Sequence, residues 1–194
     1  CNYKGESITF GKMAENIEKF HLFFKAIGIK KGDKIAISAR NSARWANTFL
    51  AVNTYGAVAV PVLSDFTPDS ISNLTDHSGA SLLFTDAEIW DKMVLGRRPA
   101  VKAVIDNSDY TLLFCSDKSI EEAFGSVELM FTEKFPFGFS SNFVQYPKDN
   151  LMDLSIINYT SGTTSAPKGV MLRYECFSAM VEFARSRVQA SDRD

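Results

Sequence analysis

The sequence contains few of the residues that build disulfide frameworks or metal sites. Its 194 residues include 3 cysteines and 2 histidines. Cys1, Cys115 and Cys176 are odd in number and far apart, so no disulfide framework is indicated and reduced thiols in the cytoplasm are expected. His21 and His77 have no cysteine or second histidine at metal-ligand spacing, so a zinc site is not expected.

The sequence also lacks an excess of basic residues and a long uninterrupted apolar segment. Lysine and arginine number 21 against 23 aspartate and glutamate, a net charge of −2. The one dense basic stretch, Arg97 to Lys102, is interpreted as a short solvated loop, so nucleic-acid binding is not expected. The longest apolar stretch, Phe49 to Leu63, is interrupted by Asn53, Thr54 and Pro61. No transmembrane segment and no signal peptide are therefore expected.

The overall composition is that of a soluble globular protein, with 45% hydrophobic and 23% charged residues. A chain of this length can bury about 70% of its unfolded surface, enough for one large domain or a domain and a fraction. The sequence starts at Cys1 rather than methionine, and it ends directly after a helical pattern. From these two ends we expect the sequence to be a piece of a longer protein.

Helical and extended segments alternate over the first two thirds of the chain. The apolar spacing from Phe10 to Ile27 predicts an amphipathic helix with Thr9 as its N-cap and His21 on its face. The alternation predicts parallel βαβ units and an α/β fold, with helices layered around mostly parallel sheets. Strands are predicted at 34–38, 58–62, 81–84 and 101–105, and further helices are predicted to start at Asn41-Ser42, Thr67-Pro68, Thr85-Asp86 and Ser119.

Three regions are expected. Residues 1–126 form an α/β N-terminal subdomain, 127–150 an aromatic-rich connector, and 151–194 a strand, loop, strand and helix that begin a further, truncated part. The connector has no sustained apolar period. We interpret it as a segment that packs its phenylalanines on the surface, and a ligand-lining aromatic loop is the alternative. Its phenylalanines are Phe131, Phe135, Phe137, Phe139 and Phe143.

The loop between two strand-like runs, 154–159 and 170–172, has a composition that suits an anion. Gly162 lets backbone N–H groups turn toward a ligand, and Lys168 supplies positive charge. Tyr159, at the end of the first run, is expected to pack rather than to catalyse. The loop hydroxyls are those of Thr160, Ser161, Thr163 and Thr164.

This loop is not a Walker A motif. That motif places Gly-Lys-Ser/Thr at the start of a helix, whereas here Pro167 precedes Lys168, Gly169 follows it, and a strand comes next. Composition alone leaves two interpretations open: an anion-binding loop, or a hairpin turn rich in serine and threonine that holds no ligand.

The sequence of the loop nevertheless closely resembles the signature loop of the adenylate-forming superfamily, which comprises acyl-CoA synthetases, firefly-type luciferases and peptide-synthetase adenylation domains. The similarity spans Tyr159 to Val170, Tyr-Thr-Ser-Gly-Thr-Thr-Ser-Ala-Pro-Lys-Gly-Val. Upstream segments resemble the family's N-terminal landmarks in sequence and order. These segments are Ile8–Phe10, Gly32–Ile37, Asn41–Trp45 and Gly56–Val62.

The resemblance implies an ATP-dependent ligase that joins a carboxylate to ATP, releases pyrophosphate, and passes the acyl group to the thiol of coenzyme A. It implies that Thr160 is also the threonine associated with Mg²⁺. The Asn-x-x-x-Trp element at 41–45 is most similar to long-chain fatty acyl-CoA synthetases, so a fatty acid, ATP and coenzyme A are the expected small-molecule partners. Peripheral membrane contact would suit such a substrate. The residues implied to bind the ATP phosphates are Thr160, Ser161, Gly162, Thr163, Thr164 and Lys168.

Two positions depart from the family pattern. Ser165 stands where the family usually has glycine, which accepts a positive φ at little cost, so a stiffer or differently shaped loop is expected. Tyr174 or a neighbour stands where a histidine is often found, and no role tied to that histidine is carried over.

Several family elements are absent from these 194 residues. They are the adenine-binding Gly-Tyr-Gly-x-Thr-Glu element, the ribose-binding aspartate and the small C-terminal domain with its catalytic lysine. No catalytic residue is therefore assigned, and the chain is expected to be inactive alone. The alternatives to an N-terminal piece of a fatty acid–CoA ligase are a piece of another adenylating enzyme, with an aryl or amino acid substrate, and a short noncatalytic homologue that acts as a binding or scaffold module.

Overall fold

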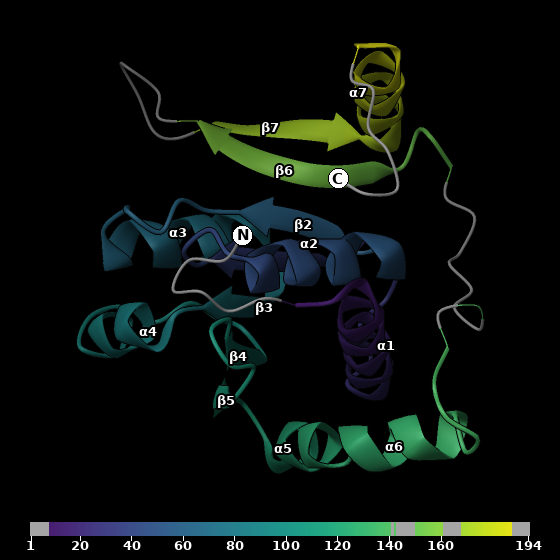
Figure 1. The fold of residues 1–194 in the computed structure, drawn as a ribbon. Coiled ribbons are helices and arrows are strands. Elements are labelled where there is room, and N and C mark those ends of the chain that lie inside the picture. Colours follow the sequence, from purple (N-terminus) through teal and green to yellow (C-terminus); the bar gives the residue numbers. More distant parts are fainter. Residues whose placement is uncertain (1–7, 141, 143–149, 161–167, 188–194) are drawn as a thin grey trace.

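The computed structural model describes residues 8–140, 142, 150–160 and 168–187. In these ranges the chain forms seven helices and one seven-stranded sheet (Figure 1). The helices are α1 (Phe10–Ala26), α2 (Ala43–Tyr55), α3 (Pro68–Ser78), α4 (Ala87–Val94), α5 (Lys118–Gly125), α6 (Val127–Lys134) and α7 (Tyr174–Arg187). The strands are β1 (Lys34–Ser38), β2 (Val58–Pro61), β3 (Ala80–Thr85), β4 (Ala103–Asp106), β5 (Leu112–Cys115), β6 (Leu154–Thr160) and β7 (Lys168–Arg173).

The sheet is parallel at its centre and antiparallel at both edges. The strand order is β5-β4-β3-β1-β2-β6-β7. The pairs β1–β2, β1–β3, β3–β4 and β2–β6 are parallel, and β4–β5 and β6–β7 are antiparallel. The predicted α/β fold with a mostly parallel sheet is confirmed. No helix in the described ranges is both long and apolar enough to cross a bilayer.

The helix starts follow from local capping. The Thr9 hydroxyl accepts from the Lys12 N–H at 3.2 Å, and the Ser42 hydroxyl accepts from the Trp45 N–H at 3.0 Å. Each hydroxyl satisfies a backbone donor that has no partner within the helix. Thr67 caps α3 in the same way. All three caps lie at predicted helix starts.

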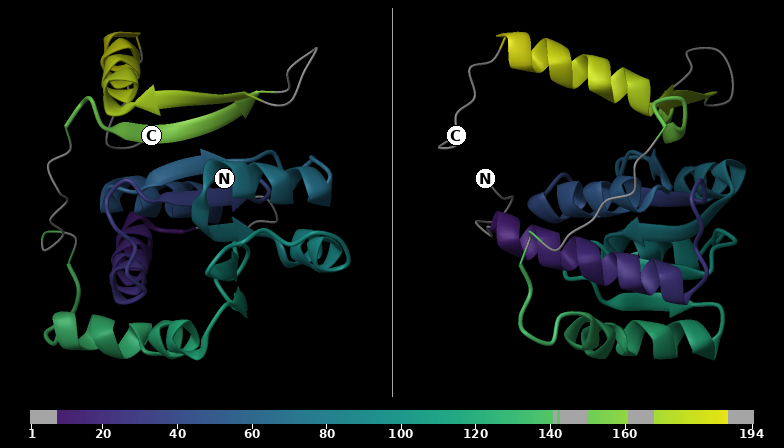
Figure 2. Two further views of the ribbon diagram at one scale, coloured as in Figure 1. Left: turned by 180° about the vertical axis from the view of Figure 1, so that it is seen from behind. Right: turned by 90° about the vertical axis from the view of Figure 1, so that its right-hand side faces the viewer.

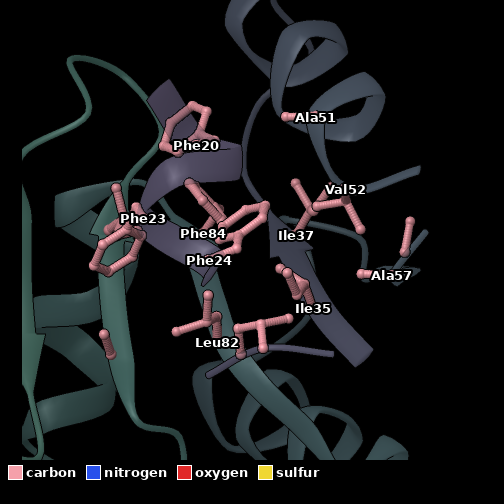
Figure 3. Close-up of a cluster of buried hydrophobic side chains, with 14 of the residues drawn as sticks. Phe20, Phe23, Phe24, Ile35, Ile37, Ala51, Val52, Ala57, Leu82 and Phe84 are labelled. Atoms are coloured by element: carbon pink, nitrogen blue, oxygen red, sulfur yellow. The ribbon is translucent and has the colours of Figure 1, made fainter. Parts of the chain in front are cut away.

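Two apolar cores lie on opposite faces of the sheet. α1, α2 and α5 cover one face, where Phe24 and Phe84 pack among side chains of β1 and β3 (Figure 3). α3 and α4 cover the other face, where Ile71 and Trp90 pack against Leu83 of β3. Figures 1 and 2 show α1 and the α3–α4 pair on opposite sides of the strands. Helices on both faces explain why the central strands are apolar without alternation.

The antiparallel strand β5 was not predicted. It follows a tight turn after β4 in which Tyr110 adopts φ 66, a left-handed conformation that is uncommon for a large side chain. Packing stabilises this conformation, because the Tyr110 ring meets Phe20 edge-on with centroids 4.8 Å apart and its hydroxyl donates to the Arg44 carbonyl at 3.2 Å.

The helix α6, which was not predicted, occupies the first residues of the predicted connector. The helix packs on α1 through charges: Lys19 Nζ lies 2.7 Å from Glu128, and Lys134 Nζ lies 2.7 Å from the buried Glu18. Phe131, Phe135 and Phe139 pack on one another, with ring centroids 5.1–5.4 Å apart. Phe137 is fully exposed, and Phe143 lies outside the described residues.

Candidate functional site

The β6–β7 hairpin carries the residues predicted to bind phosphate. Its register pairs Thr160 with Lys168 and Tyr159 with Gly169. The predicted loop therefore starts directly after Thr160 and ends directly before Lys168. The other predicted phosphate-binding residues, Ser161, Gly162, Thr163 and Thr164, lie outside the described residues, as does Ser165.

The structure brings the two described candidate residues together. Thr160 and Lys168 are directly opposite in an antiparallel pair, so their side chains share one face, with Cβ atoms about 4.5–5.5 Å apart. Both residues are exposed. A hydroxyl and an ammonium group that project side by side into solvent can bind one anion between them, the hydroxyl by donating a hydrogen bond and the ammonium by charge.

Thr160 and Lys168, which flank the loop, lie at the edge of the sheet where open α/β folds bind ligands. β6 runs parallel to β2, and β2 runs parallel to β1. Thr160 therefore ends its strand on the same side as Ser38 of β1 and Pro61 of β2. In such sheets ligands bind beyond the carboxyl ends of the parallel strands.

The entry of β6 is held by an ion pair. Lys31 Nζ lies 2.7 Å from Asp153 Oδ2, and this contact holds the pKa of the Asp153 carboxyl below its usual value. The same carboxylate accepts from the Asn150 N–H at 3.3 Å. These bonds fix the position at which the chain enters the hairpin.

The open end of the hairpin is attached to α2 through Asn53. The buried Ser155 hydroxyl donates to Asn53 Oδ1, and the Tyr174 hydroxyl donates to the Asn53 carbonyl at 2.8 Å. Tyr174, at or next to the predicted departure from the family pattern, therefore anchors the start of α7 to α2.

The exit of β6 is attached to α3 by a contact that the sequence did not indicate. Tyr159 is 6% exposed, which confirms the prediction that it packs. Its hydroxyl lies 2.7 Å from His77 Nδ1, in the last turn of α3. Burial raises the pKa of the Tyr159 hydroxyl. From the sequence, His77 could be weighed only as a metal ligand, because no local pattern links two residues that are 82 positions apart.

The described residues limit how a metal ion could be held. Within them, no group of three or more His, Cys, Asp or Glu side chains could hold a metal ion. Magnesium that bridges substrate phosphates uses one or two protein oxygens and completes its shell with water and phosphate. The exposed Thr160 hydroxyl is an oxygen donor that fits this role.

Comparison with known proteins identifies the family. The sequence model of the family described as AMP-binding enzyme matches residues 1–194. The chain belongs to this family. The resemblance noted for the loop therefore extends over the whole sequence.

The chain is also similar in sequence to individual curated proteins. The chain is 28% identical over 193 residues to the long-chain-fatty-acid–CoA ligase of Escherichia coli O157:H7, covering 92% of this chain and 34% of the relative. It is 31% identical over 176 residues to the acetyl-coenzyme A synthetase of Rhodobacter capsulatus, covering 84% of this chain and 25% of the relative.

The fold is also similar to that of a solved structure. The inhibitor-bound N-terminal domain of FACL13 from Mycobacterium tuberculosis superposes with a TM-score of 0.69 at 23% identity, over 96% of this chain and 42% of that one. The chain spans about a quarter to a third of the length of the curated relatives it matches.

Proposed function

We propose that the protein containing this chain is an ATP-dependent acid–thiol ligase and that the β6–β7 loop binds the β- and γ-phosphates of ATP. The observation that carries the proposal is the pairing of Thr160 with Lys168 at the carboxyl edge of the sheet. Membership of the AMP-binding enzyme family supports the nucleotide as the ligand. The proposed phosphate-binding set comprises Thr160, Ser161, Gly162, Thr163, Thr164 and Lys168.

The proposed reaction has two steps. A carboxylate oxygen attacks the α-phosphorus of ATP, which forms an acyl-adenylate and releases pyrophosphate. The thiol of coenzyme A then attacks the acyl carbonyl, forms the thioester and releases AMP. The first step brings two anions together, so cationic and hydrogen-bonding groups around the phosphates have the largest effect on its rate.

Lys168 and Thr160 would act on the triphosphate rather than on the carboxylate. The Lys168 ammonium offsets negative charge that grows on the departing pyrophosphate, and the Thr160 hydroxyl supplies one oxygen ligand for Mg²⁺. The metal, when bound, neutralises phosphate charge and orients the phosphates. In this role both residues bind and orient the triphosphate, and the groups that form new bonds belong to the substrates.

A fatty acid is the proposed carboxylate. The Asn41–Trp45 element at the start of α2 supports this choice, as does the similarity to the Escherichia coli ligase. The Rhodobacter capsulatus relative, named for acetate, is similar to the same degree and favours a short acid as the second candidate. Pyrophosphate release with a panel of carboxylates tests this assignment, and reaction with aromatic acids but not fatty acids would contradict it.

The phosphate role is tested by Lys168→Ala in the full-length protein. We expect ATP–pyrophosphate exchange to fall about ten- to a hundredfold, because a charge-assisted hydrogen bond contributes about 1.5–3 kcal/mol. Thr163→Ala should impair the same reaction. Lys118→Ala is the matched control, because Lys118 is an exposed lysine on α5, next to the opposite edge of the sheet. Unchanged exchange in both loop variants would refute the assignment. A full-length protein without any exchange would favour the noncatalytic alternative.

A further inference from the structure

A hydrogen-bonded side-chain pair joins the end of β6 to α3. The Tyr159 hydroxyl and His77 Nδ1 lie 2.7 Å apart, and the two rings meet edge-to-face with centroids 5.8 Å apart at an angle of 70°. Tyr159 directly precedes Thr160, the first residue of the proposed phosphate loop. The contact therefore acts at the position where the strand enters the loop.

The Tyr159 ring also limits the residue on the other side of the hairpin. Gly169 lies opposite Tyr159 and directly follows Lys168. A Cβ atom at Gly169 would lie 3.0 Å from Ile157 Cγ2 and 3.3 Å from Tyr159 Cε1. Contacts this short are tighter than nine in ten real Cβ contacts, so a side chain at residue 169 would force Ile157 and the Tyr159 ring to move by a few tenths of an ångström.

The backbone gives the exit of β6 little support on the β2 side. In the described residues the β2–β6 register pairs only Ala59 with Ile156. β2 ends at Pro61, which has no N–H to donate to a neighbouring strand. Apart from its pairing with β7, the end of β6 is therefore positioned by side chains, and the His77–Tyr159 hydrogen bond provides such a link to the helical layer.

We propose that His77, Tyr159 and Gly169 form a latch that positions Thr160 and Lys168 for the ATP phosphates. His77 fixes the Tyr159 ring on α3, and the ring in turn fixes the backbone of β7 at Gly169. Both ends of the loop are thereby set relative to the sheet. These three are positioning residues, and their role rests on the proposed function of the loop.

The test measures ATP–pyrophosphate exchange and thermal stability in variants of the full-length protein. His77→Leu and Tyr159→Phe each remove the hydrogen bond and should raise the KM for ATP about two- to tenfold, because one neutral hydrogen bond contributes about 0.5–1.5 kcal/mol. The kcat should fall by a smaller factor, because most of the phosphate charge that Lys168 meets is already present in bound ATP and only part of it develops as pyrophosphate leaves. The double variant should resemble either single variant.

Two conservative changes separate positioning from simple folding effects. His77→Asn keeps a polar atom near the place of Nδ1 and should keep the parent KM.

Gly169→Ala should raise the KM as His77→Leu does, whereas Gly125→Ala should not, because no atom lies within 4 Å of a Cβ built at Gly125. His21→Leu removes the other histidine's hydrogen bonds, which lie between α1 and α2. It should lower the melting temperature without raising the KM.

The outcomes distinguish the latch from the loop function. If Lys168→Ala abolishes exchange while His77→Leu and Tyr159→Phe keep the parent KM, the latch is refuted and the loop function stands. A lower melting temperature with an unchanged KM in both latch variants also refutes it. If Lys168→Ala leaves exchange unchanged, the proposed function fails and the latch fails with it.

Discussion

The two histidines show how the fold uses single side chains to join distant parts of the chain. His21, on α1, places Nε2 3.0 Å from the Ala51 carbonyl and 3.1 Å from Thr54 Oγ1. As the sequence predicted, it lies on a helix face. Burial lowers the pKa of His21. The hydrogen bond to the Ala51 carbonyl and the charge of Glu18 oppose this with smaller contributions, and Lys134 adds the smallest contribution, which lowers the pKa.

The lowered pKa of His21 predicts a pH-dependent stability. Above about pH 6.5, which is the ordinary pKa of histidine, His21 is neutral in both the folded and the unfolded chain. As the pH falls below this value, the unfolded chain takes up the proton first, so the free energy of unfolding should decrease. His21→Gln keeps a donor for the Ala51 carbonyl and removes the titration. Urea unfolding above and below pH 6.5 should therefore show a weaker pH dependence in the variant, and an identical dependence would contradict the prediction.

The elements with strong local signals were predictable from the sequence. Thr9, Ser42 and Thr67 mark helix starts because a capping hydroxyl acts on its immediate neighbours. β5 was missed because it is four residues long, half-buried and joined to β4 by a turn rather than a helix. α6 was missed because it has no buried side chain and so no apolar period.

The β6–β7 hairpin is attached to α2 by the hydrogen bond between Ser155 and Asn53, and the strength of this attachment can be measured by substituting each residue. Asn53→Ala leaves the buried Ser155 hydroxyl without its acceptor, which should cost about 1–3 kcal/mol of unfolding free energy. Ser155→Ala removes the hydroxyl, so the double variant should lose less than the sum of the two single losses. Denaturant unfolding of the three variants gives the coupling energy, and strict additivity would show that the two side chains do not interact.

The whole molecule depends on aromatic packing between helices and sheet. Phe24 is 0% exposed and contacts Tyr55 of α2 and Phe84 of β3, with ring centroids 5.4 and 6.4 Å away. We expect Phe24→Ala to lower the free energy of unfolding by about 3–5 kcal/mol, because the cavity cannot fully collapse. Phe10→Ala removes a side chain that is 88% exposed, and this variant should change the free energy of unfolding by less than about 0.5 kcal/mol. Equal losses in the two variants would contradict the core described for this face.

The sequence predicted candidate site residues but not the contacts that position them. Thr160 and Lys168 could be predicted because the loop residues are contiguous and their composition suits an anion. The contacts of His77 with Tyr159 and of Asn53 with Ser155 could not, because each joins residues that are neighbours only after the sheet has formed. Interactions of this kind follow from strand order, and no local pattern encodes strand order.

The position of β6 in the sheet also dictates the order of assembly during synthesis. The β6–β7 hairpin forms locally, but its docking on β2 must bring together Ala59 and Ile156, which are separated by half of the chain. Contacts across long sequence separations form slowly, and the earlier strands leave the ribosome first. Until the hairpin docks, β2 is the open edge of an apolar sheet and can pair with other chains. The nascent protein is therefore most prone to aggregate just before the hairpin proposed to bind phosphate joins the sheet.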